Sequence, residues 1–170
     1  MMIKLARHKD PDVTAHACWA LSRITLGAND KGVQAVLKAN LTRHLVGLVT
    51  HSSLLVQHAA VALCAVILGG HEQQTQEMLD WGILGRLSSL LASQDPDIRV
   101  HACLAASNIA AGTPKQLEAL MVETDLLRAV IANMSEPGTG LQGEAVWVIN
   151  NITCAGCDAH VRYPRTLFYL

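Results

Sequence analysis

The sequence predicts an all-helical array of repeated units, and three observations support that prediction. Four related strings begin at residues 16, 58, 101 and 144 and are therefore spaced by 42, 43 and 43 residues. They read HACWALSRITLG, HAAVALCAVILG, HACLAASNIAAG and EAVWVINNITCAG. Hydrophobic residues make up 51% of the 170 residues and charged residues 16%, which supports a sizeable core and argues against disorder. No polar–apolar alternation of period two persists, so no strands are expected.

Each unit is expected to contain one long helix, and these helices are placed near residues 11–27, 53–69, 96–112 and 141–155. Turn-like clusters precede them, and the DPDV string at Asp10–Val13 returns as DPDI at Asp95–Ile98. Aspartate and proline at these places favour a helix start. Glycines such as Gly27 and Gly112 follow the apolar run and are expected to end the helix.

Two shorter helical segments are expected between successive long helices. The first kind covers Lys31–Ala39, Glu72–Trp81 and Pro114–Glu123, and the second covers Leu41–Val49, Ile83–Leu91 and Asp125–Met134. Three helices in a period of about 40–47 residues favour the armadillo unit over the two-helix HEAT unit. The prediction is therefore a right-handed armadillo-repeat superhelix, an α-solenoid of about four units of 42–43 residues.

The array is expected to cover residues 1–156, and residues 157–170 are expected to form an incomplete or irregular C-terminal tail. The sequence begins just before a long helix and ends just after the fourth one. We therefore expect a fragment of a longer solenoid, with some apolar stacking surface exposed at its ends.

Composition also limits the function classes. The formal net charge of −1 argues against a nucleic-acid binder driven by bulk positive charge. No apolar run of about 20 residues predicts a membrane span, and the N-terminal residues show no signal-peptide core. Five cysteines without a secretory signal are expected to be reduced thiols in an intracellular protein.

One face of each long helix is a candidate binding surface. Positions i, i+3 and i+7 share a side of a helix, whereas Ala17, Leu21 and Ile24 are expected to point into the core. In a solenoid, the same side of successive units lines up along a concave groove. This face comprises His16, Trp19 and Arg23; His58, Val61 and Ala65; His101, Leu104 and Asn108; and Glu144, Trp147 and Asn151.

These residues carry a resemblance to a known family. A tryptophan followed four residues later by asparagine in the long third helix is the hallmark of importin-α, and Trp147–Asn151 (WVINN) has this pattern. Cys18–Ser22 (CWALS) resembles the same helix of a middle repeat, and Glu72–Glu77 resembles the family's short first helix. The resemblance extends over roughly residues 10–156. It places the units near the centre of the family's longer array.

The resemblance implies a nuclear import adaptor that binds basic nuclear localization signals and has no enzymatic activity. Indole rings would flank the stems of lysine or arginine, asparagines would hold the peptide backbone, and acidic residues would take the charge. No cofactor or metal is implied. Importin-β would bind only through a basic segment absent here, and the protein would occupy cytoplasm and nucleus. The site residues implied are Trp147, Asn151, Trp19, Asn108, Glu144, Leu104, Arg23 and His101.

The sequence also departs from the family pattern. Arg23 stands where asparagine is expected and would repel a basic peptide, while Val61 and Ala65 leave no pocket in the second unit. Leu104 replaces tryptophan in the third unit, and three units have histidine where the family is often acidic. A generic armadillo scaffold with a non-basic partner is therefore the alternative function. A non-functional partial product is a further alternative.

Three other features of the sequence are better explained by ordinary structural roles than by a functional site. Cys154, Cys157 and His160 resemble half a zinc site, but a second ligand pair is missing. The GTGLQG string at Gly138–Gly143 matches a dinucleotide fingerprint without the strand that such a motif needs, so an inter-helix loop is expected. A redox or nucleotide enzyme built on these features is the least favoured alternative. Trp81, on another helix, is expected to serve packing.

Overall fold

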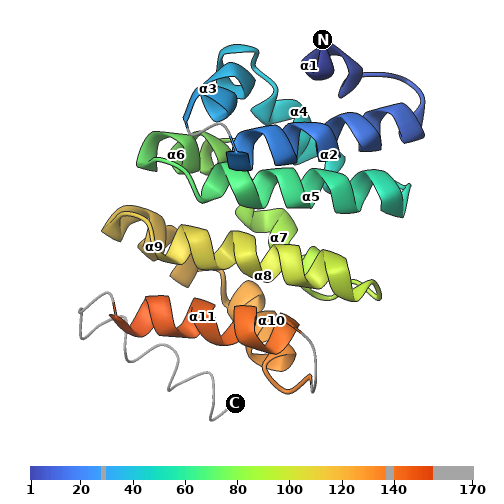
Figure 1. Ribbon diagram of the computed structural model, residues 1–170. Coiled ribbons are helices and arrows are strands. Elements are labelled where there is room, and N and C mark those ends of the chain that lie inside the picture. Colours follow the sequence, from blue (N-terminus) through green and yellow to red (C-terminus); the bar gives the residue numbers. More distant parts are fainter. Residues whose placement is uncertain (28–29, 137–139, 155–170) are drawn as a thin grey trace. The chain divides into compact units, whose positions relative to one another are not determined.

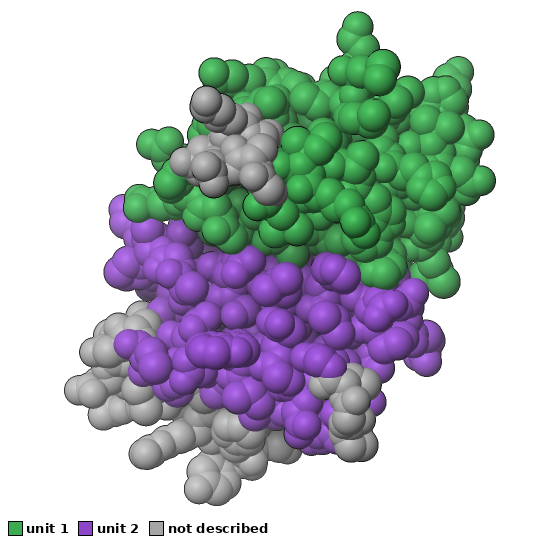
Figure 2. Space-filling view, viewed as in Figure 1, with its two compact units in different colours: residues 1–83 green, residues 84–170 purple. Residues whose placement is uncertain are grey.

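A computed structural model describes residues 1–27, 30–136 and 140–154 of the chain. Every regular element in this part is a helix, and no strand occurs in it (Figure 1). The chain divides into two compact units, residues 1–83 and residues 84–170 (Figure 2). None of the described helices is long and apolar enough to cross a membrane. The predicted all-α class is confirmed.

Unit 1 contains two long helices, α2 and α5, which pack along each other. The shorter helix α1, which the sequence analysis did not predict, packs against α2. The α4 and α6 helices pack on α5. The helices of this unit are α1 (Met2–Leu5), α2 (Pro11–Gly27), α3 (Asp30–Lys38), α4 (Thr42–Leu48), α5 (Leu54–Leu68) and α6 (Glu72–Asp80).

Unit 2 repeats the same pattern with α8 and α11 as its long helices, again packed along each other. Helix α10 packs on α7 behind them, and α9 follows α8. The helices of this unit are α7 (Leu84–Leu91), α8 (Pro96–Ala110), α9 (Pro114–Met121), α10 (Thr124–Asn133) and α11 (Gly140–Cys154).

Local sequence explains where several of these helices begin. Asp95 caps α8, because its Oδ1 accepts the Asp97 N–H at 2.9 Å, and Pro96 occupies the first helical turn. A reciprocal cap opens α9. There the Thr113 N–H donates to Gln116 Oε1 at 3.0 Å, and the Gln116 N–H donates to Thr113 Oγ1 at 3.3 Å.

The glycines that precede α6 and α9 make room for a buried glutamine. Gln74 and Gln116 are almost completely buried, and each accepts a backbone N–H at the start of its helix. A Cβ atom on Gly70 would lie 1.7 Å from Gln74 Oε1, and one on Gly112 would lie 2.4 Å from Gln116 Oε1. The capping glutamine therefore favours glycine at both places, whereas neither glycine has the positive φ that a left-handed helix end requires.

The core is aliphatic, and α5 is buried on nearly all sides. A polar side chain also contributes to the core of unit 2. Asn133, only 4% exposed, donates from Nδ2 to Leu91 O at 3.0 Å and to Ala129 O at 2.8 Å. This amide satisfies a carbonyl at the end of α7 and joins that helix to α10.

Two expectations from the sequence need correction, one about a core residue and one about a loop. Ile24 was expected in the core but is 49% exposed, whereas Ala17 and Leu21 are buried as predicted. The preceding helix α1 has only four residues, and the pocket that it forms with α2 reaches no further than Ala20. The inter-helix loop expected at Gly138–Gly143 is also wrong in part, because residues 140–143 form the first turn of α11. Residues 138 and 139 lie outside the described residues.

Candidate functional site

The strongest candidate surface in unit 2 lies on α8 and α11, and we name it the α8–α11 face. Helix α8 supplies its residues at positions i, i+3 and i+7, and α11 supplies the equivalent ones. Trp147 is 57% exposed, an unusual state for so large an apolar ring. The other five residues are partly buried. The face comprises His101, Leu104, Asn108, Glu144, Trp147 and Asn151.

Glu144 stands one turn before Trp147 and gives this face a carboxylate. Its negative charge reaches α8, where it contributes to a raised pKa of the Cys103 thiol. Burial of Cys103 is the larger cause, Arg99 acts in the opposite direction, and the pKa rises to about 12. An acidic group beside an exposed indole can receive a cationic side chain.

Asn151 joins the two long helices of unit 2. Its Nδ2 donates to Ser107 O at 3.0 Å and to Ser107 Oγ at 3.1 Å. Because these bonds use the amide N–H groups, the amide oxygen is the atom that can accept an N–H from a bound peptide. Sequence reasoning did not identify Ser107, since only the pairing of two successive repeats brings it to Asn151.

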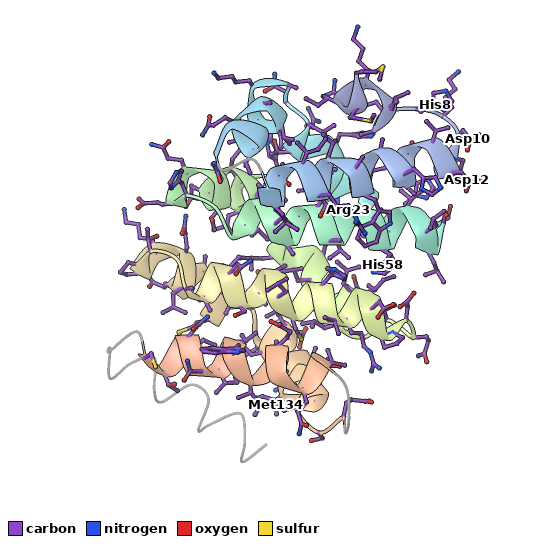
Figure 3. All side chains as sticks on the ribbon, viewed as in Figure 1. His8, Asp10, Asp12, Arg23, His58 and Met134 are labelled. Carbon is purple, nitrogen blue, oxygen red and sulfur yellow. The ribbon has the colours of Figure 1, made fainter. Side chains whose placement is uncertain are left out.

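The equivalent surface of unit 1 lies on α2 and α5, and we name it the α2–α5 face. The rings of Trp19 and His58 meet edge to face, with their centroids 5.0 Å apart at 81°. Arg23 is exposed on α2 (Figure 3). Val61 and Ala65 are fully buried, so α5 presents neither side chain to a ligand. The face comprises His16, Trp19, Arg23, His58, Val61 and Ala65.

Further contacts involve residues on and outside these faces. His101 donates from Nδ1 to Asp97 O at 2.8 Å, so this ring is held against the first turn of α8. Arg99 forms an ion pair with Glu136 at 3.4 Å. Trp81, expected to serve packing, remains 43% exposed and carries the Arg43 guanidinium 5.1 Å from its ring centroid. This cation–π pair was not predicted from the sequence.

Cys157 and His160 of the expected half zinc site lie outside the described residues. Cys154 is exposed at the end of α11. Across residues 1–27, 30–136 and 140–154, no group of three or more His, Cys, Asp or Glu side chains is placed to hold a metal ion.

The buried thiols should be unreactive in the folded protein. Burial raises the pKa of Cys18 to about 11 and that of Cys103 to about 12, and it also raises the pKa of Cys64. Thiolate is the reactive form, so at pH 8 we expect Ellman's reagent to label exposed Cys154 quickly and these three only after urea unfolding.

The same pKa shifts give a sign for the pH dependence of stability. Above pH 9 the unfolded chain releases thiol protons that the folded chain retains, so the free energy of unfolding should fall as the pH rises. Well below pH 9 both states keep the thiol protons, so these thiols should not change the free energy of unfolding there. A Cys154→Ser/Cys157→Ser variant serves as the labelling control, and fast labelling of its folded form would contradict the buried-thiol assignment.

Sequence comparisons agree with the repeat architecture. Residues 71–111 match the armadillo/β-catenin-like repeat. Importin subunit alpha-1a of Oryza sativa subsp. japonica is 37% identical over 121 residues, which cover 71% of this chain and 23% of that protein. Importin subunit alpha-8 of Arabidopsis thaliana is 29% identical over 160 residues, which cover 94% of this chain and 36% of that protein. The chain thus spans well under half the length of these relatives.

Solved armadillo structures match the fold. A designed armadillo repeat protein in complex with peptide (KR)4 gives a TM-score of 0.90 at 27% identity, covering 98% of this chain and 68% of that one. A second designed armadillo repeat protein gives a TM-score of 0.91 at 26% identity, with the same coverage. The helices, the repeat match and the sequence relatives agree: the chain is an armadillo-repeat protein, and its sequence is similar to part of importin-α.

Proposed function

We propose that this chain is a non-catalytic part of a nuclear import adaptor and that its α8–α11 face binds basic nuclear localization peptides. The observation that carries the proposal is the exposed indole of Trp147, with Glu144 one turn before it and Asn151 one turn after it on the same helix. The importin names of the relatives, and the basic peptide bound by a designed armadillo protein, support the same peptide class.

The chemistry follows from the side chains of α11. The aliphatic stem of a lysine or arginine would lie against the exposed indole and cover its apolar surface, while the charged head stays in water. The ring face attracts the cation, and the Glu144 carboxylate adds a charge-assisted contact. The Asn151 amide oxygen would accept a backbone N–H from the extended peptide. Leu104 and Asn108 on α8 would flank the peptide, and His101 would lie at the edge.

A titration tests the proposal. A fluorescent lysine-rich localization peptide should bind saturably by anisotropy, and the same peptide with alanine in place of lysine should bind about tenfold more weakly or worse. Binding should also weaken when salt is raised, because charge attraction contributes to it. Equal binding of the two peptides by a folded, monomeric sample would contradict the basic-peptide function.

A generic armadillo scaffold with a non-basic partner is the second candidate. The observation that favours it lies in unit 1, where exposed Arg23 occupies the position that asparagine holds in the family pattern. A scaffold of this kind would bind an extended peptide without selecting lysine.

A further inference from the structure

The α2–α5 face lacks the features that would accept a lysine. Helix α5 has the sequence LLVQHAAVALCAVIL and contains no carboxylate. Helix α2 contains a single acid, Asp12, in its first turn, about three turns before Arg23. Val61 and Ala65 are fully buried and offer no contact. Among the described side chains of α2 and α5, a lysine ammonium near Arg23 would therefore meet a guanidinium and no carboxylate.

The indole on this face is also already engaged. Trp19 is partly buried and packs edge to face with His58, with ring centroids 5.0 Å apart. On the α8–α11 face, by contrast, Trp147 is 57% exposed. An edge-to-face contact is a favourable arrangement for aromatic rings, so a cationic stem would compete with His58 for part of the Trp19 surface. The two faces therefore differ in chemistry although they occupy equivalent repeat positions.

We propose that the α2–α5 face binds an acidic peptide segment and that Arg23 selects its aspartate or glutamate side chain. Arg23, labelled in Figure 3, stands one turn after Trp19 on the same side of α2, and the residue is exposed. Five N–H donors in a planar fork suit a bidentate contact with a carboxylate. The same charge rejects a basic side chain, which adds specificity.

The proposal rests on the proposed function only in that the chain binds extended peptides. It assigns a second peptide chemistry to unit 1, whereas the basic-peptide face belongs to unit 2. A partner that uses both faces would need acidic residues as well as lysines. Peptide binding at each face can therefore be measured separately, with a peptide of the matching charge.

The test compares an alternating glutamate–glycine peptide with an alternating glutamine–glycine peptide, both fluorescent, on the full chain. The acidic peptide should bind about fivefold more tightly than the neutral one, the gain expected for an exposed ion pair. Arg23→Asn should remove this advantage, and Arg23→Glu should reverse it. Arg128→Gln, which removes another exposed charge on α10, should change acidic-peptide binding by less than about twofold.

The outcomes separate this inference from the import function. Equal binding of the acidic and neutral peptides, or an Arg128→Gln loss as large as that of Arg23→Asn, would overturn the inference. A localization peptide measured in parallel should bind the Arg23→Asn variant at least as tightly as the original chain, because the substitution removes a charge that repels a basic peptide. If that peptide fails to bind while acidic-peptide binding still depends on Arg23, the import function fails and the inference stands.

Discussion

Replacing Trp147 with alanine is expected to weaken binding of a lysine-rich localization peptide about thirtyfold. The exposed indole is the largest apolar surface on the α8–α11 face, and its removal ends both the stem contact and the cation–π attraction. An interface tryptophan of this kind contributes about 2 kcal/mol or more, which corresponds to the expected change in Kd. Fluorescence anisotropy at low salt measures the effect directly.

The chain offers a matched control for this variant. Trp81 is 43% exposed, close to the exposure of Trp147, but it lies at the end of α6 and is covered by the Arg43 guanidinium. Trp81→Ala should therefore change peptide affinity by less than about twofold. If both variants lose binding equally, the effect of Trp147 reflects general destabilisation or non-specific adhesion, and the α8–α11 face is not the binding site.

The long helices could be predicted because their signals are repeated. Equivalent strings at near-constant spacing locate α2, α5, α8 and α11, and aspartate and proline at the start of α8 act through local backbone bonds that sequence displays directly. The sequence also indicated glycines before α6 and α9, but not that their role includes space for Gln74 and Gln116. That role depends on a side chain that folds back four residues later.

For the candidate site, the sequence predicts which residues share a face of each long helix, but not their contacts or their exposure. The i, i+3, i+7 rule assigns Trp19 and Trp147 to equivalent positions, yet one ring packs against His58 and the other is exposed. The contact of Asn151 with Ser107 likewise joins two repeats 44 residues apart in the chain. Such differences depend on which neighbouring repeat covers a position, and helical periodicity within one unit contains no information about that neighbour.

Ile24 and Ile109 also occupy equivalent repeat positions but differ in burial, and this difference should affect stability. Both stand eight residues after the histidine that opens their repeat string, and both lie inside a long helix. Ile109 is completely buried, whereas Ile24 is 49% exposed. The two positions form a natural matched pair, because the intrinsic helix preference of isoleucine against alanine cancels between them.

Ile109→Ala is therefore expected to lower the free energy of unfolding by about 3 kcal/mol, since it removes buried methyl groups and leaves a cavity in unit 2. Ile24→Ala should change it by less than about 1 kcal/mol, since no cavity forms at an exposed site. Urea unfolding followed by circular dichroism measures both, and the slope with denaturant shows whether the transition stays cooperative. Equal losses would mean that Ile24 is covered in solution, and the α2 surface described for unit 1 would then be wrong.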